Sequence, residues 1–573
     1  MKKLLLIVTC ALLMLSFAGC TINLGNGVHV NEGGIYKSDL PTISGVGNKS
    51  NTNRPTTSSG GGNNTQTSNG DGNNTQNSTG NNTQTSNGGG NNTQTSSGGG
   101  NNTQASTGEG NGGGASEQPS GEVSSDIKPL SYGGLSEAAY VTWNETSVAS
   151  AKAYYKLSSD SNYTEVDKEL IRETASGKAR VDILGLKAGT YDLRVHVGGQ
   201  NKDIEVKSVK VTPYDRSGYA HYQYTEGVGA YKDDGTLKSG AVVVYVNDSN
   251  KNSVSGNGKT GLGNILASAT GSKPVVVRII GRIATKTKNS SGSWTGSETQ
   301  LSGLTDKSGN GDNSYYNMFN LSSIKYLTLE GVGEDAEIYQ WGMTFKNSNS
   351  VEVRNLTFTN YPEDACAFEG SAGSESKYKN YWIHNNCFNA GKNAFDETSE
   401  QDKGKGDGAT DIKRVNSATY SYNIYNACHK TGLIGGSDSD VQWNITAHHN
   451  YYNSVYSRVP LGRNANMHYY NNYYNKVGGT CMSIRGTGFM FSECNYFASC
   501  SKTVELKNSG KVKSYNDVGI KGATTVSSRT ASVSNSCKYD TTFNYTQSYV
   551  TDANTAKSDC EKYAGPCKAN PVK

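Results

Sequence analysis

Two arginines five residues apart, and two aspartates some fifty residues before them, are the residues of this chain best suited to chemistry. The arginines are Arg458 and Arg463, which flank Pro460, and the aspartates are Asp407 and Asp411. Guanidinium groups bind carboxylates in a forked geometry, and paired carboxylates bind hard metal cations. The combination predicts a metal-assisted site for an anionic substrate. The alternative is two surface arginines and two surface aspartates.

A repeating strand pattern surrounds these residues. From about residue 219 onward, short runs of β-branched and aromatic residues recur without long helical segments between them. Asparagines end many of these runs, and the last three lie about 22 residues apart: Asn386, Asn423, Asn450, Asn472 and Asn495. This spacing fits coils of three short strands, with asparagine in a left-handed bend and its amide bonded to the like residue one coil on. We therefore expect an all-β chain with a right-handed parallel β-helix over residues 216–573. An ordinary β-sandwich would explain the strands but not the spacing.

Residues 129–215 have a different pattern, with apolar alternation in short runs separated by turn signals. The expected strands are residues 139–143, 151–155, 179–184, 190–197 and 204–211. This pattern predicts a small antiparallel β-sandwich before the β-helix. With Trp143 and the turn at 185–191, the segment resembles a fibronectin type III domain. We expect it to act as a spacer. The alternative role is the binding of carbohydrate or protein.

The N-terminal part carries targeting and linker signals. Residues 1–20 combine Lys2 and Lys3 with an apolar run too short to span a bilayer, and they end in Ala18-Gly19-Cys20. This resembles a bacterial lipoprotein signal, so we expect export with Cys20 as the lipidated N-terminus; an ordinary secretory signal would also give export. Residues 21–128 are mostly low-complexity Gly, Asn, Thr and Ser, which bury too little apolar surface to offset ordering and predict a flexible linker.

The charge and the cysteine content of the chain bear on its partners and on disulfide formation. The formal net charge is +4, and no basic run or nucleic-acid motif is present, so a nucleic-acid partner is not expected. Nine cysteines follow Cys20, and export permits disulfides. Cys494 with Cys500, or Cys560 with Cys567, could pair locally, although the spacing fixes no connectivity.

Several motifs of the β-helical part resemble the pectate lyases, polysaccharide lyase family 1 of the pectate and pectin lyase superfamily. In chain order, the matching segments are residues 274–281, 327–333, 353–356, 407–413, 429–439, 449–452, 458–463 and 468–472. Their order and spacing agree with the family pattern.

The resemblance implies a substrate, a reaction and a cofactor. The substrate is polygalacturonate, a polyanion with one carboxylate per sugar. The reaction is β-elimination, in which a base removes the C5 proton beside the carboxylate and the C4 oxygen leaves. The implied cofactor is Ca²⁺, which takes hard oxygen ligands; Asp364, Asp407 and Asp411 match the family's metal positions, and Glu363 could add an oxygen.

By the same resemblance, Arg458 is the base, while Lys430 and Arg463 bind substrate carboxylates. Free arginine is protonated at ordinary pH, so neighbouring calcium and cationic groups must disfavour the charged form, and we expect an alkaline optimum. The alternative is that Arg458 only orients the substrate. We expect a monomer, secreted or on the cell surface, that touches a membrane only through the lipid on Cys20.

Two segments depart from the family pattern. The family often has Trp-Ile-Asp-His where residues 382–385 read Trp-Ile-His-Asn, so the acidic–basic pair is missing there. We expect this change to affect local packing rather than chemistry. Leu461 and Gly462 replace residues that are often more polar or basic in relatives. This replacement could reduce the positive charge that lines the cleft.

Four histidines in the expected coils raise the question of a second metal site: His429, His448, His449 and His468. His448 and His449 are adjacent in an expected strand, so their side chains should point to opposite faces. We therefore expect stacking or hydrogen bonding within the β-helix rather than a metal. Tyr451 and Tyr469 are expected in the core or in stacked ladders rather than as sugar platforms.

Three other functions compete with the calcium-dependent lyase. A pectin lyase would act on methylated pectin without calcium, but the retained Asp407 and Asp411 argue against it. A polygalacturonase would share the β-helix but would need paired catalytic carboxylates across a water molecule. From a different class, a non-catalytic pectin-binding or adhesive β-helix would be held on the cell surface by the N-terminal linker.

Overall fold

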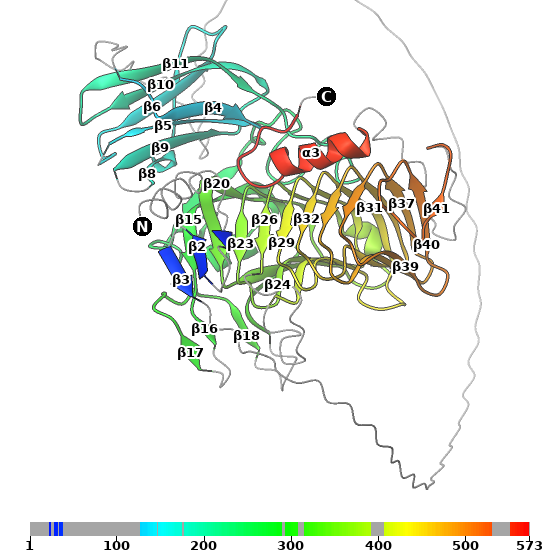
Figure 1. Ribbon diagram of the computed structural model, residues 1–573. Helices are drawn as coiled ribbons and strands as arrows, with labels where there is room; N and C mark the ends of the chain where they lie inside the picture. The colour runs from blue at the N-terminus through cyan, green and yellow to red at the C-terminus, as the bar shows by residue number, and fades with distance from the viewer. Residues whose placement is uncertain are drawn as a thin grey trace, which may run out of the picture. The chain divides into compact units, whose positions relative to one another are not determined.

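The structure is a computed structural model that describes residues 22–23, 28–31, 34–37, 127–145, 147–174, 177–288, 293–307, 315–390, 406–529 and 550–571 (Figure 1). The chain divides into two compact units, residues 1–101 and 102–573. The first unit contains an antiparallel sheet of β1 (Ile22–Asn23), β2 (Val28–Asn31) and β3 (Gly34–Lys37), which the sequence pattern did not predict. Cys20 and the Gly/Asn/Thr repeats lie outside the described residues.

A parallel β-helix makes up most of the second unit, and its strands pair in two sheets. The larger sheet contains, in order, β12 (Val242–Val246), β15 (Thr270–Ala284), β20 (Lys325–Tyr339), β22 (Asn349–Arg354), β23 (Thr357–Thr359), β25 (Lys379–His384), β26 (Cys387–Asn389), β28 (Asn416–Ser421), β29 (Ile424–Asn426), β31 (Gln442–His448), β32 (Tyr451–Asn453), β34 (Ala465–Tyr470), β35 (Tyr473–Asn475), β37 (Phe489–Glu493), β38 (Tyr496–Ala498), β40 (Lys511–Tyr515) and β41 (Thr524–Thr525).

The second sheet contains β18 (Thr305–Lys307), β19 (Tyr315–Ser322), β21 (Gly342–Lys346), β24 (Asp364–Glu369), β27 (Gly408–Lys413), β30 (Leu433–Ile434), β33 (Leu461–Arg463), β36 (Thr480–Arg485) and β39 (Lys502–Leu506). All of its pairings are parallel except that of β18 with β19.

Each typical coil runs through a long strand, a three-residue strand and a strand of the second sheet. Long strands pair with long strands of the next coil, as β25 does with β28, and short strands pair with short strands, as β26 does with β29. The predicted fold class is confirmed: an all-β chain with a parallel β-helix preceded by a small β-sandwich.

Asparagines form a ladder at one corner of the coils. The backbone N–H and Nδ2 of Asn386 donate to Oδ1 of Asn423 at 3.0 and 3.1 Å. The same pattern continues through Asn450, Asn472 and Asn495, and the last rung is Asp517. The predicted amide contact between coils is therefore confirmed.

The prediction that these asparagines take the left-handed bend is wrong. The positive φ angles, from 51° to 54°, lie one residue earlier: Asn385, Tyr422, His449, Asn471, Cys494 and Asn516. Each asparagine of the ladder must present both its backbone N–H and its side-chain amide to the next coil. The residue before it therefore adopts the left-handed backbone, even where that residue has a bulky side chain.

A stack of aromatic rings fills the interior beside the ladder. Successive ring centroids lie 4.4 to 5.1 Å apart in Phe358, Phe388, Tyr425, Tyr452, Tyr474 and Phe497. Tyr469 lies in the same hydrophobic core, and Tyr451 stacks on Tyr473 with a centroid distance of 5.0 Å. The structure thus confirms core and ladder positions for the two tyrosines named from the sequence.

Two antiparallel four-stranded sheets form the β-sandwich. One contains β4 (Ser131–Leu135), β5 (Ala138–Asn144), β9 (Lys178–Leu184) and β8 (Ile171–Glu173); the other contains β11 (Lys202–Val211), β10 (Gly189–Val197), β6 (Lys152–Leu157) and β7 (Thr164–Glu165). All five expected strands are present, and Trp143 is buried between the sheets. Its indole N–H donates to Oε2 of Glu145 at 2.7 Å.

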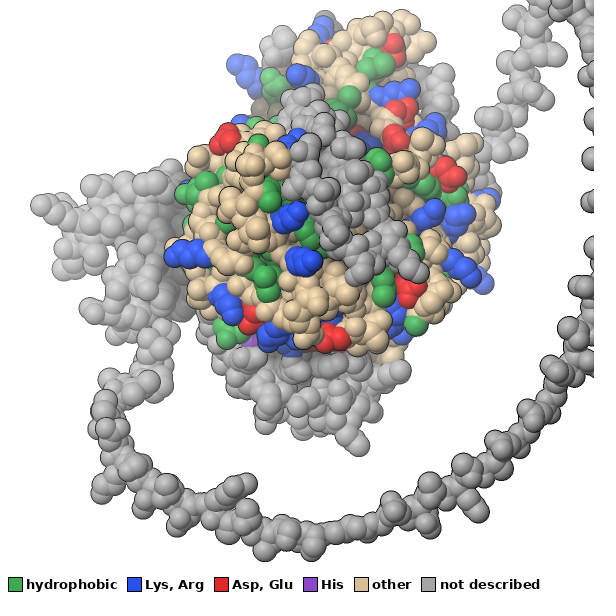
Figure 2. All heavy atoms as spheres, turned by 90° about the vertical axis from the view of Figure 1, so that its right-hand side faces the viewer, with side chains coloured by type: hydrophobic (Ala, Val, Ile, Leu, Met, Phe, Trp, Pro, Cys, Tyr) green, Lys and Arg blue, Asp and Glu red, His purple; other side chains and the backbone are tan. Residues whose placement is uncertain are grey.

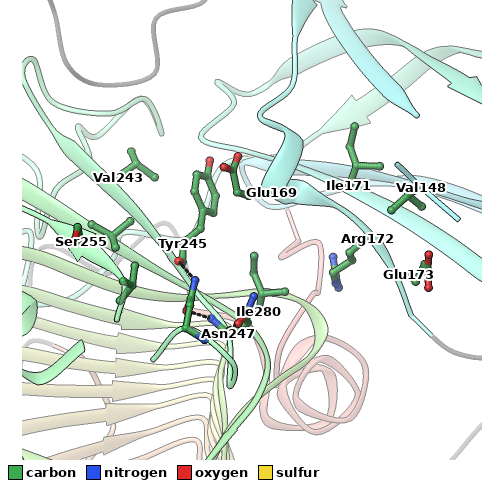
Figure 3. A pocket seen from close by; sticks show the side chains of 13 residues that line it. Val148, Glu169, Ile171, Arg172, Glu173, Val243, Tyr245, Asn247, Ser255 and Ile280 are labelled. Atoms are coloured by element: carbon green, nitrogen blue, oxygen red, sulfur yellow. Dashed lines mark hydrogen bonds between the residues drawn. The ribbon is translucent and has the colours of Figure 1, made fainter. Parts of the chain in front are cut away.

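The sandwich packs directly on the first coils of the β-helix. Val332 of β20 belongs to the hydrophobic core of the sandwich. Arg172 bonds Asp182 at 2.5 Å within the sandwich and Asp335 of β20 at 2.6 Å. A hollow of about 600 Å³ lies beside this contact, with Glu169 and Tyr245 among its lining residues (Figure 3). The sandwich is therefore packed against the β-helix, and the spacer role stays a prediction.

Two segments tie the parts together. A strap, residues 214–220, crosses the long strands: the N–H of Tyr219 donates to Thr446 at 3.1 Å and that of Ala220 to Thr419 at 2.9 Å. The helix α3 (Ala553–Tyr563) lies along the β-helix and is capped by Asp552 (Figure 1).

The remaining described elements are short: η1 (Lys168–Leu170), β13 (Ser255–Gly256), β14 (Lys259–Thr260), α2 (Leu262–Ala267), β16 (Thr287–Lys288), β17 (Trp294–Thr295) and η3 (Glu375–Lys377). Among the described residues, none of the helices is long and apolar enough to cross a membrane. On the face in Figure 2, Lys and Arg side chains are scattered among uncharged and acidic ones rather than gathered in one stripe.

Candidate active site

The predicted site residues lie on or beside four consecutive strands of the second sheet. Asp364 begins β24, and it pairs with Gly408 at the start of β27, which also carries Asp411. Lys430 forms a bridge with Ser457, one residue before Arg458. Parallel pairing in register therefore stacks residues that are tens of positions apart along one edge of the sheet.

The carboxylates of Asp364 and Asp411 converge over Gly408. A Cβ placed on Gly408 would lie 2.5 Å from Oδ1 of Asp364 and 2.7 Å from Oδ1 of Asp411. Glycine is therefore required here, because any side chain would occupy the space between the two carboxylates. The backbone N–H of Leu433 donates to Oδ1 of Asp411 at 3.0 Å and fixes that group.

The electrostatics of this acidic group favour a bound cation. Burial and the negative charges of Asp411, Glu363 and Asp407 raise the pKa of Asp364 well above its ordinary value, and Lys413 opposes this only in part. Among the described residues, Oδ1 of Asp364 is buried and has no hydrogen-bond partner. A buried carboxylate oxygen without a donor, facing a second carboxylate, is a group that a metal ion would satisfy.

The donor set fits calcium. Asp364 and Asp411 offer hard carboxylate oxygens that already point at one another, and Glu363 contributes negative charge beside them. Asp407 is close enough to influence Asp364, but its Oδ1 accepts a hydrogen bond from Nζ of Lys430 at 2.7 Å. The structure thus brings together all three predicted metal ligands, with Asp407 directed at Lys430.

The basic residues of the site, Lys430 and Arg458, lie one and two coils after Asp411. Lys430 is buried, and Arg458 is half-buried with a left-handed backbone, φ 59°. The peptide bond between Val459 and Pro460 is cis, and the carbonyl of Arg458 accepts the N–H of Gly432 at 2.7 Å. The hydrogen bond to Gly432 holds the Arg458 backbone against the preceding coil.

Arg463 ends β33 and lies in a cluster of cations. Its Nε donates to Oδ1 of Asp438 at 3.0 Å, and its Nη1 donates to the carbonyl of Gly435 at 2.6 Å. Burial and the charge of Arg485, followed by that of Arg458, lower the pKa of Arg463, while Asp438 raises it. The neighbouring guanidinium groups therefore already disfavour the charged form of Arg463 before any substrate binds.

The comparisons with known proteins agree with this arrangement. The pectate lyase family profile matches residues 235–569, which is more than half of the chain. The chain belongs to the pectate lyase family. Pectate lyase C of Dickeya chrysanthemi is 34% identical over 181 residues, covering 31% of this chain and 48% of that protein. Pectate lyase 2 of Pectobacterium carotovorum is 33% identical over 186 residues, covering 32% and 48%. The chain thus spans about half the length of these curated relatives.

Solved structures of pectate lyases also resemble this chain. Pectate lyase Bsp165PelA from Bacillus sp. N165, solved in complex with trigalacturonate, has a TM-score of 0.42 and 21% identity, covering 61% of this chain and 99% of that one. Pectate lyase C from Erwinia chrysanthemi, solved with Ca²⁺, has a TM-score of 0.39 and 20% identity, covering 61% and 96%. The fold of this pectate lyase family member is established by its own strand pairing.

Sequence reasoning missed two basic residues of this pectate lyase family site. Lys413 lies beside Asp364 and Asp411, and these carboxylates raise its pKa although burial acts in the opposite direction. The signal was present, because Lys413 follows Asp411 by two residues in a strand and so shares its face. Arg485 pairs in register with Arg463, 22 residues earlier, which is one coil.

A hollow of about 270 Å³ extends this site toward the N-terminal coils. Glu363, Asp364 and Lys413 line one part of it, and Asn320 and Lys346 of the preceding strands line another. The acidic group therefore opens onto a groove that continues along the sheet and is not confined to a closed cavity.

The departures from the family pattern lie in packed positions. His384 stacks on Trp382 with a centroid distance of 3.6 Å, and its Nε2 lies 3.0 Å from Oε1 of Glu352. All three are buried within the long-strand column, which agrees with a packing role. A Cβ on Gly462 would lie 2.7 Å from Met467, so that position faces inward, and only Leu461 shares the face of Arg463.

The expectation that His448 and His449 point to opposite faces is wrong. Their Nδ1 atoms lie 3.0 Å apart, because β31 ends at His448 and His449 has a left-handed backbone, φ 51°. The expected stacking is present: His449 stacks on Tyr422 and His448 on Tyr470, with centroid distances of 4.6 and 4.8 Å.

Proposed function

We propose that this protein is a calcium-dependent pectate lyase that cleaves polygalacturonate by β-elimination to give unsaturated oligogalacturonides. The observation that carries the proposal is the convergence of Asp364 and Asp411 over Gly408, with Arg458 and Arg463 on the following coils of the same sheet. Family membership and the names of the relatives support the activity.

Calcium bound by Asp364, Asp407, Asp411 and Glu363 would supply positive charge that stabilises the negative charge developing on the substrate carboxylate. The protein holds these carboxylates close together by parallel strand register and by the absence of a side chain at Gly408. Glycine at that position keeps the space between the carboxylates open for the cation.

Arg458 acts as the base in this proposal. Its side chain takes the C5 proton, the C5–H electrons form the C4–C5 double bond, and the C4–O bond breaks with its electrons on the leaving oxygen. That oxygen then takes a proton from solvent. Free arginine is protonated at ordinary pH, so the proposal predicts activity that rises at alkaline pH.

Lys430 and Arg463 bind substrate carboxylates. Lys430 is a point charge at the edge of the acidic group, and Arg463 presents a planar fork to a carboxylate. Lys413, two residues after Asp411, adds a third cation on the groove side. Cationic side chains on successive coils suit a polymer with one carboxylate per sugar.

The decisive experiment incubates the purified full chain with polygalacturonate, with and without a calcium chelator. Ultraviolet absorbance of an unsaturated product that disappears with chelator supports the lyase. The same absorbance with chelator present, on methylated pectin, would indicate a pectin lyase. New reducing ends without absorbance would indicate hydrolysis, and binding without cleavage would indicate an adhesive protein.

We further propose that the protein is exported and held on the outer face of a bacterial membrane by a lipid on Cys20, with residues 21–128 as the linker. The sequence of residues 1–20 and the composition of the linker support this. We propose a monomer in which residues 129–215 form a fibronectin type III-like domain. Mass measurement of the mature N-terminus tests the lipid, and light scattering tests the oligomeric state.

A further inference from the structure

A second group of metal-ligating side chains lies outside the acidic–arginine site. Asp215 lies on the strap, His448 ends β31, and His449 follows it. The two histidines are adjacent, whereas Asp215 lies more than two hundred positions before them in the sequence. They meet because the strap is hydrogen-bonded across the long strands and because the left-handed backbone of His449 turns its ring back toward His448.

The distances among the ligand atoms suit a small metal ion. Nδ1 of His448 lies 3.0 Å from Nδ1 of His449 and 4.0 Å from Oδ2 of Asp215, and one ligand atom from each residue lies within 4.8 Å of the other two. In a tetrahedral zinc site with bonds of about 2.0 to 2.1 Å, ligand atoms lie about 3.3 to 3.4 Å apart. The three groups therefore need only small shifts to enclose one ion.

The surrounding contacts orient His448 and Asp215 as a metal site requires. Nε2 of His448 lies 3.2 Å from the carbonyl of Ser217, so Nε2–H donates there and Nδ1 keeps its lone pair. Oδ1 of Asp215 accepts the N–H of Ser217 at 3.1 Å, and Oδ2 accepts the hydroxyl of Tyr422 at 3.1 Å. These bonds leave the carboxylate anchored with one oxygen toward the histidines.

The burial of these three side chains favours a bound cation. Both histidines have an exposed fraction of 0%, and Asp215 of 7%. Among the residues that the structure describes, no lysine or arginine forms an ion pair with Asp215, so its buried carboxylate is offset by the hydrogen bonds from Ser217 and Tyr422 and by no cationic side chain of those two types. Two imidazole nitrogens and a carboxylate oxygen would be satisfied together by a divalent ion.

We propose that Asp215, His448 and His449 form a structural zinc site that fastens the strap to the β-helix. Two imidazole nitrogens select a transition metal over calcium, which prefers oxygen ligands, so this site and the acidic group bind different ions. Three protein ligands leave one tetrahedral position for water. Because the ligands are buried, zinc enters while the chain folds and before the strap closes.

The experiment measures zinc in the full chain refolded with zinc and excess calcium, then desalted, by plasma mass spectrometry. We expect about one zinc per chain, and with cobalt(II) in its place the visible absorption of a tetrahedral nitrogen-ligated ion. Asp215→Asn and His449→Gln should lose the zinc. His196→Gln, a histidine of the sandwich paired with Asp203, is the matched control and should keep it.

Wild-type protein that refolds with calcium but carries no zinc and no cobalt absorption would overturn the proposal and leave a hydrogen-bonded histidine pair. Zinc retained by both variants would also overturn it, because the ion would then lie elsewhere. Should a variant fail to fold, thermal unfolding of the wild type decides: zinc must raise its Tm in the presence of saturating calcium, and an unchanged Tm contradicts the site.

Discussion

Nζ of Lys430 lies 2.7 Å from Oδ1 of Asp407, so a residue proposed to bind substrate is paired with a residue proposed to bind calcium. The pair is mostly buried, with side-chain exposures of 11% and 12%. If calcium binds as proposed, it and Lys430 would compete for the same carboxylate oxygen. Binding of the metal would release the ammonium group toward the groove, where a substrate carboxylate can replace Asp407.

This competition predicts the effect of Lys430→Met on calcium binding. Removal of the ammonium frees Asp407 and deletes a positive charge beside the metal, so calcium should bind about three- to tenfold more tightly. Activity should fall, because a substrate-binding cation is lost. Calorimetric titration with calcium checks the affinity, and Lys502→Met, at an exposed lysine of β39, is the control. Weaker calcium binding in Lys430→Met would contradict the competition.

Asp364→Asn should raise the stability of the metal-free protein and weaken its binding of calcium. Burial and neighbouring carboxylates raise the pKa of Asp364, so the metal-free protein loses stability as pH rises above the ordinary value of 3.8, toward the higher folded value. The amide removes this loss, so the metal-free variant should have a higher Tm than wild type at pH 8. Calcium should bind at least about tenfold more weakly to it.

Calorimetric melting curves with chelator and with calcium measure both effects. The stabilisation of wild type by calcium should be larger at pH 8 than at pH 4.5, because calcium then displaces fewer protons from the carboxylates. A metal-free Asp364→Asn variant with a lower Tm at pH 8 would show that the acidic group is not strained.

Much of this site could be predicted from sequence because its elements are local. Asp407 and Asp411 share one segment, as do Arg458 and Arg463, and strand periodicity with recurring asparagines indicated that the two segments stack. Parallel pairing then leaves little freedom, since each coil must lie in register on the last. The residues that the family pattern marked are those the structure brings together.

The parts that could not be predicted depend on backbone angles and on contacts between distant segments. The left-handed bend one residue before each rung turned His449 toward His448, and strand alternation alone gives the opposite result. The pairing of Asp215 with His448 depends on where the strap crosses the sheet. The contact of Arg172 with Asp335 joins two domains, and no local pattern encodes it.

Arg458→Lys tests the proposed base. An ammonium group cannot reproduce the position of the guanidine between Pro460 and the acidic group, so kcat should fall at least about 100-fold, with KM little changed. The rate of unsaturated product formation measures this, and an unchanged Tm shows that the fold is intact. Arg463→Lys should instead raise KM, because it loses a forked carboxylate contact. Near wild-type kcat in Arg458→Lys would assign Arg458 a positioning role.

Arg172→Met should weaken the junction of the sandwich and the β-helix. Asp182 is buried and bonds both Arg172 and Arg180, whose charges outweigh burial and hold its pKa below the ordinary value. Loss of one partner should cost about 2 to 3 kcal/mol of unfolding free energy, measured by urea denaturation. Asp335→Asn removes only the exposed partner and should cost less than about 1 kcal/mol. Equal costs would show that the buried pair is not the stabilising contact.

The last rung of the asparagine ladder should make stability depend on pH. Asp517 accepts the N–H and Nδ2 of Asn495 at 2.7 and 3.1 Å and the hydroxyl of Ser514 at 2.6 Å, yet burial raises its pKa to about 6. Because the folded value exceeds the ordinary 3.8, the protein loses stability as pH rises between these values, and no further loss from this group follows above them.

Asp517→Asn should remove that loss. An amide keeps an oxygen for Asn495, and its Nδ2 can donate to the carbonyl of Ser492, which lies three residues before the preceding rung, as Tyr420 does for Asn450. Since Asp517 is partly exposed, we expect the free energy of unfolding to rise by about 1 to 2 kcal/mol at pH 8 and by almost nothing at pH 4.

Asn450→Asp is the matched control. It places a charge in a fully buried position of the ladder and removes two donated hydrogen bonds, so it should destabilise the protein at every pH above 4. Urea unfolding of both variants at the two pH values measures these changes, and an Asp517→Asn variant less stable than wild type at pH 8 would show that the ladder needs a carboxylate at its end.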